Sequence, residues 1–431
     1  MKDTIKIALL GLGTVGTGVY KVLKNQQDEM LDKLGCQVSV SRILVRNVEK
    51  AAKKVDDAAI LTTSWQDILE DPEIDIVVEV MGGLEPAKTY IEAALRAGKN
   101  VVTANKDLIA ECGHELLELA SSLKRDLLFE AAVAGGIPII CPLSQCLQGN
   151  HLQQIMGIVN GTTNFILTKM TNEGMDYAEA LALAQELGYA EADPTADVEG
   201  LDAGRKMAIM ASLAFHSRVT FSDVTTEGIS KITARDIRYA KEMGCRIKLM
   251  GMARDTAGGV EVSVHPMLIS ENHPLAAVND SFNAVMVHGD AVGDTMFYGR
   301  GAGEKPTASA IVGDLFEIVR DIRCGCCARV SVAGYRSLPI KPESETENKY
   351  FIRMKVEDRY GVLAAVTSIF GCHKVSIEQI IQKRKSENNA EIVVITERVK
   401  DKHLQSSIEA ISHLEVINSV ASVIRVYDDQ N

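Results

Sequence analysis

The sequence predicts an α/β fold built from a doubly wound parallel sheet, a mixed-sheet α+β region and a C-terminal α+β unit. Three observations predict it. Over the first 140 residues, short apolar strands alternate with amphipathic helices, and a glycine-rich turn directly follows the first strand. From about residue 150 this alternation gives way to longer strands. Beyond residue 350 the order of elements is strand, helix, strand, strand, helix, strand.

The first region contains parallel strands that are apolar or β-branched and bounded by turn residues. The expected strands are 5–10, 37–45, 74–83, 99–106 and one that opens the segment 126–140. The expected helices are a first one ending near residue 25, then 65–70, 86–97 and 114–124. Because strands and helices alternate, the sheet should be covered by helices on both faces.

The second region should form a mixed sheet with its own helices. Its expected helices are 162–170, 176–189 and 201–215, and its expected strands are one ending near 160, then 245–254, 259–269 and 283–289. A helix over 306–322 should return to the first domain. A proline-containing, charged segment then leads into strands 350–356, 375–382, 390–397 and 422–427 with helices 361–370 and 401–413, a ferredoxin-like unit.

Length and pattern together give three domains. A chain of 431 residues allows two to four at about 150 residues each. We expect a first domain over 1–130, completed by about 306–340, and a second domain over 131–305. A linker over 341–349 and a C-terminal domain over 350–431 follow.

Composition excludes several classes of protein. The chain has 46 Lys and Arg against 58 Asp and Glu, a net charge of −12, which argues against general binding of nucleic acid or anionic membranes. It leaves room for a local basic pocket that holds one phosphate. No apolar run is long enough to predict a transmembrane helix, the N-terminus does not resemble a signal peptide, and the nine cysteines favour reduced thiols. These features predict a cytoplasmic protein.

The turn after the first strand carries the pattern G-x-G-x-x-G at Gly11, Gly13 and Gly16. Gly11 permits a tight turn, Gly13 lets the backbone approach a pyrophosphate, and Gly16 lets the helix pack on the strand. Because the pattern stands between a strand and a helix, it predicts a Rossmann-type dinucleotide site. That site would include the intervening residues Leu12, Thr14 and Val15. The alternative is a glycine turn in a domain of this type that binds no ligand.

The end of the second strand bears on the choice of cofactor. Sites selective for NAD usually carry Asp or Glu there, which binds the ribose 2′-hydroxyl. Here Arg46 and Asn47 stand at that place, and Lys50 and Lys53 follow. Because a guanidinium can hold a 2′-phosphate with two hydrogen bonds, Arg46 favours NADP over NAD. The alternative is a solvated arginine at a strand end.

Two lysines and several carboxylates could perform acid–base chemistry. Asp202 and Lys206 are four residues apart on an apolar helix, where a carboxylate can orient an amine for proton transfer. Spacing alone also fits an ordinary surface pair. Lys106 follows a strand, at the edge of the sheet where ligands bind in such folds. The acidic segment with Glu191, Asp193 and Asp197 could bind a substrate ammonium or cap a helix.

Taken together, these motifs resemble those of homoserine dehydrogenase. The matching segments are GLGTVG (11–16), EVMGG (79–83), TANK (103–106), EAAVAGGIPI (130–139), NGTTNFIL (160–167), GYAEADPTADVEGLDAGRK (188–206) and GRGAGEKPTASA (299–310). The C-terminal unit resembles an ACT regulatory domain, and the resemblance implies that 1–130 is the nucleotide-binding domain and 131–305 the catalytic and dimerisation domain. The resemblance implies NAD(P)-dependent interconversion of L-homoserine and L-aspartate 4-semialdehyde, in threonine and methionine biosynthesis.

The resemblance also assigns expected roles to residues of this chain. Lys206 matches the acid–base lysine, and Lys106 matches its partner near cofactor and substrate. Asp202 and Glu191 match substrate-binding carboxylates, with Asp202 also part of the catalytic set. Thr103, Gly188 and Gly303 match positions that bind the cofactor.

A metal is implied in the same way. The segment from Glu130 resembles the family's sodium site, with the carboxylate of Glu130 and the carbonyl oxygens of Val133, Gly135 and Ile137 as ligands. Hard oxygen ligands suit such a cation, and its role would be structural. From the residues alone this segment is a glycine-rich strand end without a metal.

Departures from the family pattern occur at a few positions. Gly204 replaces an expected alanine, and Arg300 and Lys305 stand in the loop on the cofactor side. In the ACT-like unit, Tyr360 replaces a common proline, and 371–374 lacks an expected Asn-Gly turn. The unit therefore either binds an amino-acid effector, such as threonine, or serves only for association.

Two other functions stay open from sequence. One is an ACT-controlled amino-acid sensor with degenerate catalysis, and the other is an oxidoreductase for another semialdehyde. We expect a homodimer or homotetramer without nucleic-acid or membrane partners.

The group Cys324, Cys326 and Cys327 lacks a second pair of ligands, so we interpret it as buried thiols and not as a zinc site.

Overall fold

The computed structural model describes residues 2–329, 334, 336–386 and 389–428. The chain falls into two compact units, which we describe separately. The first unit comprises Met1–Ile155, Arg205–Val224 and Asn283–Leu338. The second comprises Met156–Gly204, Thr225–Phe282 and Pro339–Asn431.

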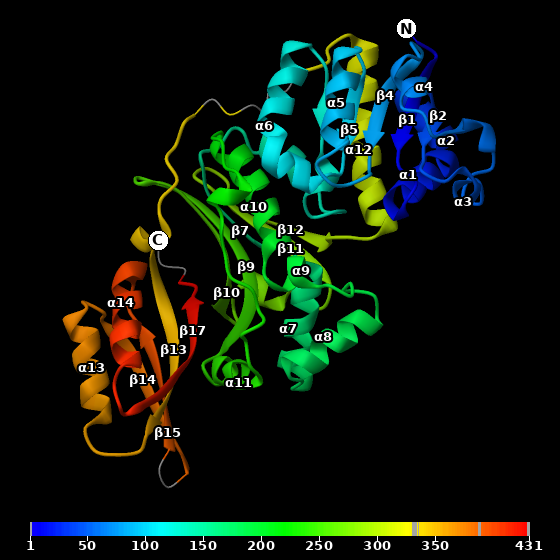
Figure 1. Cartoon of the computed structure of the whole chain (residues 1–431). Coiled ribbons are helices and arrows are strands. Elements are labelled where there is room, and N and C mark those ends of the chain that lie inside the picture. The colour runs from blue at the N-terminus through cyan, green and yellow to red at the C-terminus, as the bar shows by residue number, and fades with distance from the viewer. Residues whose placement is uncertain (1, 330–333, 335, 387–388, 429–431) are drawn as a thin grey trace. The chain divides into compact units, whose positions relative to one another are not determined.

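A six-stranded parallel sheet forms the centre of the first unit, in the order β3-β2-β1-β4-β5-β6 (Figure 1). Its strands are β1 (Thr4–Leu10), β2 (Gln37–Leu44), β3 (Leu61–Thr62), β4 (Ile74–Glu79), β5 (Asn100–Thr103) and β6 (Leu127–Leu128). The order reverses direction between β1 and β4. In open parallel sheets, ligands bind at the carboxyl ends of the strands beside this reversal. The predicted doubly wound fold is therefore confirmed.

Helices cover both faces of this sheet, as two hydrophobic cores show. Along β1, Ile5, Ile7 and Leu9 belong to one core, and Ala8 and Leu10 belong to the other. The helices of the domain are α1 (Thr14–Asn25), α2 (Gln27–Leu34), α3 (Val48–Ala52), α4 (Gln66–Leu69), α5 (Ala87–Arg96), α6 (Lys106–Ser122) and α12 (Glu304–Cys324).

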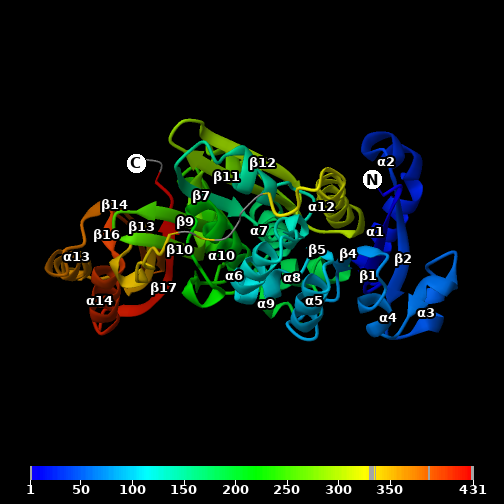
Figure 2. The same cartoon turned by 90° about the horizontal axis from the view of Figure 1, so that it is seen from above.

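Helix α12 comes from far along the chain and packs directly against α1 (Figure 2). A Cβ added at Gly18 of α1 would lie 2.7 Å from the carbonyl oxygen of Glu304, so the two backbones approach too closely for a side chain. Apolar residues of α12, including Ile311, Leu315 and Ile318, complete the core above β1. This packing makes α12 an integral part of the nucleotide-binding fold.

Some boundaries differ from those expected from sequence. Helix α6 begins at Lys106, eight residues before the predicted start, because Asn105 caps it: the Asn105 side chain accepts a hydrogen bond from the backbone of Leu108. The short helices α2 and α3 were not expected. Helix α2 ends at Gly35, whose left-handed φ of 64° stops the helix.

The second unit contains a continuous sheet in the order β9-β10-β17-β13-β15-β14. Its strands are β8 (Thr225–Thr226), β9 (Cys245–Thr256), β10 (Gly259–Ser270), β13 (Glu347–Glu357), β14 (Ile377–Ser386), β15 (Asn389–Thr396), β16 (Val399–Lys400) and β17 (Ile417–Val426). Its complete helices are α7 (Gly161–Glu173), α8 (Tyr177–Glu186), α9 (Thr195–Val198), α11 (Ala234–Glu242), α13 (Val362–Cys372) and α14 (Asp401–Ser412).

Three further strands and one helix complete the chain. Strands β11 (Phe282–Gly289) and β12 (Gly293–Arg300) belong almost wholly to the first unit, and β7 (Leu152–Ile158) contributes to both. Helix α10 (Leu201–Phe215) likewise begins in the second unit and continues in the first. Its bounds are those expected from the sequence.

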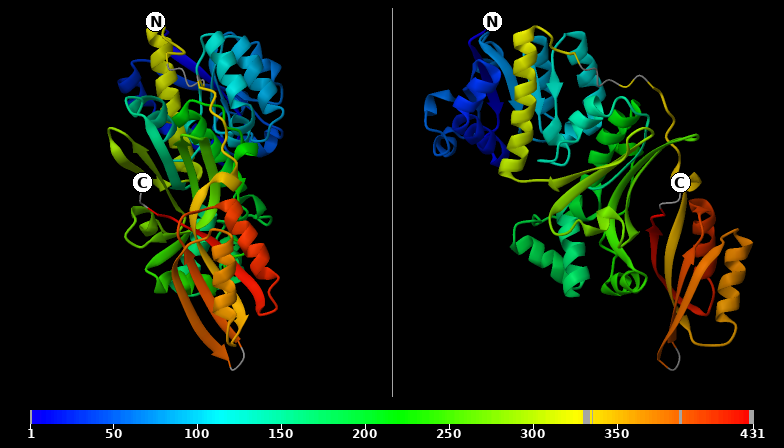
Figure 3. Two further views of the ribbon diagram at one scale, coloured as in Figure 1. Left: turned by 90° about the vertical axis from the view of Figure 1, so that its left-hand side faces the viewer. Right: turned by 180° about the vertical axis from the view of Figure 1, so that it is seen from behind.

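The C-terminal elements form the predicted βαββαβ unit. Helices α13 and α14 lie together on one face of the sheet β17-β13-β15-β14 (Figure 3), over a core that includes Ile352, Val366 and Leu404. Strand β17 also pairs in parallel with β10, through Met267 with Arg425 and Leu268 with Val426. The C-terminal sheet therefore extends the sheet of the preceding region.

Among the described residues, no helix combines the length and the apolar character that crossing a bilayer requires.

Candidate active site

The glycine turn has the geometry that close backbone contacts demand. Gly11 has a φ of 107°, which other residues rarely adopt. A Cβ at Gly16 would lie 2.3 Å from the carbonyl oxygen of Gly11, so only glycine allows α1 to begin so close to β1. Gly13 precedes the first residue of α1, and nothing lies within 4 Å of the place a Cβ would take. Its amide and those of the first helical turn can therefore be approached by an anion.

A cleft of about 840 Å³ opens at this end of the sheet. Gly11, Leu12 and Gly13 line one side of it, and Arg46 lines it after β2. Thr14, Val15 and Gly16 lie in the first turn of α1, outside the lining.

Three cations line this cleft: Arg46, Lys50 and Lys54. Lys54, which the sequence interpretation did not include, donates a hydrogen bond to the carbonyl oxygen of Leu12 at 2.9 Å. Lys53 is not among the lining residues. The cleft thus combines a backbone turn suited to a pyrophosphate with positive charge at the end of β2.

A buried carboxylate organises the ends of β4 and β5. Glu79 is fully buried; its Oε1 accepts the amides of Met81 and Gly82, and its Oε2 accepts the hydroxyl of Thr103 at 2.6 Å. The Thr103 hydroxyl in turn accepts the amide of Asn105. Sequence reasoning assigned no role to Glu79 or Asn105, although both stand in the motifs EVMGG and TANK. Their hydrogen bonds fix the backbone that leads into Lys106.

An ion pair in the first unit links the neighbours of the two candidate lysines. Asp107 follows Lys106 in the first turn of α6, and Arg205 precedes Lys206 on α10. The Nε of Arg205 lies 2.9 Å from Oδ1 of Asp107, and its guanidinium stacks 4.7 Å from the ring centroid of Phe221. Lys106 and Lys206 are both half-buried. The pair therefore brings the backbone segments of the two lysines side by side.

In the second unit, Asp202 belongs to a buried polar cluster. The side-chain amide of Asn160 donates to Asp202 Oδ2 at 2.9 Å and to Asp197 Oδ1 at 2.7 Å. The hydroxyl of Thr162 lies 3.1 Å from Asp197 Oδ2 and 2.7 Å from the carbonyl oxygen of Tyr189. Sequence reasoning missed Asn160 and Thr162; their only signal is their place in the motif NGTTNFIL.

The other acidic candidates differ in their surroundings. Glu191 is exposed, and its backbone carbonyl accepts a hydrogen bond from Gln185. Asp193 is exposed and accepts both the amide and the hydroxyl of Thr195, a local turn that lowers the pKa of the Asp193 carboxyl. Of the acidic group Glu191, Asp193 and Asp197, only Glu191 thus presents a carboxylate that no hydrogen bond described for this unit engages.

The two remaining cofactor candidates are exposed glycines. Gly188 has a φ of 77° after α8, and Gly303 has a φ of 125° immediately before α12. Gly188 belongs to the second unit and Gly303 to the first.

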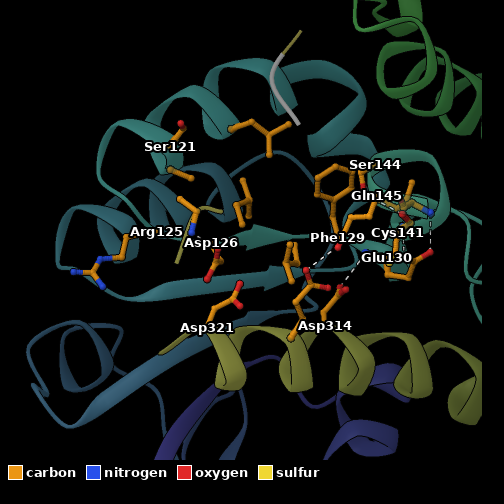
Figure 4. Close-up of a pocket in the computed structure, with 17 residues that line it drawn as sticks. Ser121, Arg125, Asp126, Phe129, Glu130, Cys141, Ser144, Gln145, Asp314 and Asp321 are labelled. Atoms are coloured by element: carbon orange, nitrogen blue, oxygen red, sulfur yellow. Dashed lines mark hydrogen bonds between the residues drawn. The ribbon is translucent and has the colours of Figure 1, made fainter. Parts of the chain in front are cut away.

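The segment expected to bind sodium is folded around Glu130 (Figure 4). Its Oε1 accepts the amides of Ile139 and Ile140 at 2.6 and 2.8 Å, and its Oε2 accepts that of Cys141 at 2.8 Å. Burial raises the pKa of the Glu130 carboxyl. The backbone amide of Glu130 donates to Oδ2 of Asp314, whose pKa burial also raises.

The expected carbonyl ligands have a different environment. In the described part of the chain, no backbone amide donates to the carbonyl oxygens of Val133, Gly135 or Ile137. A Cβ at Gly135 would lie 2.3 Å from the carbonyl oxygen of Gly301. Carbonyl oxygens are ligands that a hard cation accepts, whereas the Glu130 carboxylate is already held by three amides. Over the described residues, no group of three or more His, Cys, Asp or Glu forms a metal-binding set.

One sequence interpretation needs correction. The cysteines expected to be buried are not: Cys324 is exposed at the end of α12, and Cys326 and Cys327 are partly exposed. The helix ends at Gly325, with its left-handed φ of 67°, so the cysteines fall on a surface turn and not on an internal face.

The fold and the cleft define a class of protein, a dinucleotide-binding oxidoreductase with an appended regulatory domain. Comparison with known proteins shows which family within this class the chain belongs to. Residues 11–130 match the NAD-binding domain of homoserine dehydrogenase, 138–316 match homoserine dehydrogenase itself, and 350–415 match the ACT domain. The chain belongs to the homoserine dehydrogenase family.

Relatives and solved structures agree along the whole chain. Homoserine dehydrogenase of Bacillus subtilis (strain 168) is 45% identical over 98% of both chains, and that of Corynebacterium glutamicum is 45% identical over 99% of this chain and 96% of its own. The structure of a homoserine dehydrogenase from Thiobacillus denitrificans superposes with a TM-score of 0.94 at 42% identity, over 99% of this chain and 98% of that one. A hyperthermophilic archaeal homoserine dehydrogenase in complex with NADPH covers 73% of this chain and 97% of its own, at 27% identity and a TM-score of 0.63.

The activity follows from this membership. The chain is a homoserine dehydrogenase, an oxidoreductase that interconverts L-homoserine and L-aspartate 4-semialdehyde with a nicotinamide cofactor. A sensor with degenerate catalysis and an enzyme for another semialdehyde are not favoured.

Proposed function

We propose that this homoserine dehydrogenase prefers NADP and uses Lys206 as its proton donor and acceptor, with Lys106 beside it. The main support for the paired lysines is the Asp107–Arg205 ion pair, because it brings the segments of both lysines together in one unit. Gly11, Leu12 and Gly13 line the cleft with Arg46, and the start of α1 supplies further amides. These residues, with Thr103, Gly188 and Gly303, would hold the cofactor.

The residues act as follows in semialdehyde reduction. The nicotinamide, when bound, supplies the hydride to the aldehyde carbon. The ammonium of Lys206 donates a proton to the aldehyde oxygen as negative charge develops there, and in the reverse direction its neutral amine accepts the hydroxyl proton. The exposed carboxylate of Glu191 binds the substrate ammonium, and Asp202 holds the substrate from the start of α10.

The decisive test is the turnover of Lys206→Ala with homoserine and NADP⁺. We expect kcat to fall about 10²–10⁴-fold, because proton transfer loses its donor, while the KM for NADP⁺ changes little. Lys305→Ala, which removes an exposed lysine in the first turn of α12, is the control for removal of a positive charge. Unchanged turnover of Lys206→Ala would refute the mechanism.

The cofactor preference has its own test. Steady-state kinetics of the wild type should show a lower KM for NADP⁺ than for NAD⁺, and Arg46→Ala should raise the KM for NADP⁺ alone, since only NADP carries the 2′-phosphate. Lys50 and Lys54 share the cleft, so their alanine variants should have smaller effects in the same direction. A wild-type preference for NAD⁺ would contradict the role of Arg46.

We further propose that a sodium ion binds the carbonyl oxygens of Val133, Gly135 and Ile137 together with Glu130. The carbonyl oxygens without backbone donors support this structural site. We expect NaCl to raise the midpoint of thermal unfolding more than KCl at equal ionic strength. The difference should vanish in Glu130→Gln. Identical curves in the two salts would exclude a specific sodium site.

For the ACT domain we propose an amino-acid effector, with threonine as the first ligand to test. Calorimetric titration with threonine should give heat of binding, accompanied by inhibition of turnover. If the titration gives no heat and turnover is not inhibited, association remains as the role of the domain.

The oligomeric state has a separate test. Sedimentation at several protein concentrations decides between the expected homodimer and homotetramer.

A further inference from the structure

Asn160 stands out because one buried side chain serves two carboxylates and a helix terminus. It precedes α7, is 5% exposed, and its Oδ1 accepts both the amide and the hydroxyl of Thr163 at 2.9 Å. Its Nδ2 carries two hydrogens, one directed to Asp197 and one to Asp202. The hydrogen-bonding capacity of this amide is therefore fully used.

The orientation of this amide is determined by its partners. A backbone N–H faces Oδ1, so that atom must be the acceptor, and two carboxylates face Nδ2, which must be the donor. The reversed orientation would place an oxygen against both carboxylates. The carboxylate of Asp202 thus has a defined donor in a buried setting, where such hydrogen bonds are strongest.

The chain between the two carboxylates is bent so that this arrangement can form. Asp197 lies on α9 and Asp202 in the first turn of α10, and Gly200 between them has a φ of 79°. A Cβ at Gly200 would lie 3.3 Å from Cγ1 of Val264, so the turn is also tightly packed. The shared neutral donor, Nδ2 of Asn160, links the two carboxylates across this turn.

We infer that Asn160 is a positioning residue for the carboxylate of Asp202 and thereby sets the affinity for homoserine. The inference rests on the proposed role of Asp202 in binding substrate. Thr162 supports the arrangement from the other side, because its hydroxyl holds the second oxygen of Asp197. The second hydrogen of the Asn160 amide then fixes the carboxylate of Asp202 against rotation.

The test separates this role from helix capping. Serine and aspartate cap helices as well as asparagine does, so Asn160→Ser and Asn160→Asp keep the cap of α7 and lose the bridging donor. We expect Asn160→Ser to raise the KM for homoserine about tenfold, with the KM for NADP⁺ and the thermal midpoint unchanged. Asn160→Asp should raise the KM for homoserine further, since it adds a third carboxylate. Calorimetric titration with homoserine should show the same losses of affinity.

Asp176→Ser is the matched control, because Asp176 caps the neighbouring helix α8 and contacts neither carboxylate. We expect its KM for homoserine to equal that of the wild type. Asp202→Asn tests the underlying assumption: an unchanged KM for homoserine would overturn the proposed role of Asp202. A raised KM in Asp202→Asn with wild-type values in both Asn160 variants would overturn the inference about Asn160 alone.

Discussion

Lys248 on β9 shows how a single buried charge affects the protein. It is 2% exposed, and its ammonium donates to Asn164 Oδ1 at 3.0 Å, to the carbonyl oxygen of Val278 and to Asn279 Oδ1. Burial lowers the pKa of Lys248 to about 7, from an ordinary value of 10.5. The lysine therefore connects α7 to the loop before β11 and at the same time carries a cost of desolvation.

The sign of this effect gives a pH-dependent prediction. Between pH 7 and 10.5 the unfolded chain keeps the proton of Lys248 and the folded chain releases it, so this residue makes the free energy of unfolding rise with pH. We expect the wild type to gain stability relative to Lys248→Met as the pH rises from 6.5 to 9.5. The gain in the free energy of unfolding should be at most about 3 kcal/mol. Urea unfolding at the two pH values measures it.

Lys33→Met provides the control, since Lys33 is exposed on α2 and pairs with Glu29. It changes the net charge equally without removing a buried cation. A difference between wild type and Lys248→Met that does not depend on pH would contradict the lowered pKa.

Between elements, the Asp107–Arg205 ion pair connects the start of α6 to α10. The pair is partly exposed, with side chains 38% and 27% accessible, so its contribution to stability is small, at most about 1 kcal/mol. Its importance lies in position, because it stands next to both candidate lysines. A small displacement of a reacting group is enough to slow a reaction substantially.

A charge swap tests the pair. We expect Asp107→Arg and Arg205→Asp each to lower kcat for homoserine oxidation about tenfold, with the thermal midpoint nearly unchanged. The double variant should recover most of the activity, because it restores an ion pair with reversed polarity. Failure of the double variant to recover any activity, in folded protein, would show that the two residues act separately.

The elements themselves were well predicted where periodicity was clear. Helix α10 has the expected bounds, and β1, β2, β4, β5 and β6 overlap the expected strands, whereas the two-residue strand β3 was not expected. Helix α11 and strand β12 were not expected. In α11 charged residues outnumber apolar ones, and along β12 half-buried residues alternate with exposed ones, so neither forms a clear apolar run. The N-terminus of α6 was missed because a side-chain cap, and not an apolar pattern, determines it.

Across the second unit, a buried polar network joins the C-terminal sheet to α11. The guanidinium of Arg353 on β13 contacts Asp236 Oδ1 at 2.8 Å, Glu391 Oε1 at 3.3 Å and the hydroxyl of Ser422 at 3.0 Å. Arg353, Asp236 and Glu391 are each at most 3% exposed in their side chains. Together with the pairing of β10 and β17, this network makes the ACT domain part of a larger compact unit.

Removal of Arg353 should therefore destabilise the protein strongly. Arg353→Ala removes the cation beside the buried carboxylate of Asp236, while Glu391 keeps its ion pair with Arg235. We expect a loss of about 3–5 kcal/mol in the free energy of unfolding. The comparison is Arg359→Ala, whose 53% exposed side chain pairs with Glu357 and should contribute less than about 1 kcal/mol. Similar losses in both variants, measured by urea unfolding, would contradict a coupling role for the buried network.

The sequence by itself determined the architecture, the cofactor class and the family of this protein. Those properties depend on local patterns: the period of apolar residues, glycines at turns that only they can form, and motifs read along the chain. Gly11 and Gly16 were assigned their roles in this way, and the structure gives both the geometry that the assignment requires.

The tertiary structure decided which polar side chains meet. Asn160 reaches Asp202 and Arg353 reaches Asp236 over long stretches of chain, and Asp107 meets Arg205 in the same way. Hydrogen bonds and ion pairs between distant segments leave no periodic trace in the sequence, since they depend on how the segments pack. For this reason the candidate lysines could be named from sequence, while the residues that hold and orient the site became visible only in the fold.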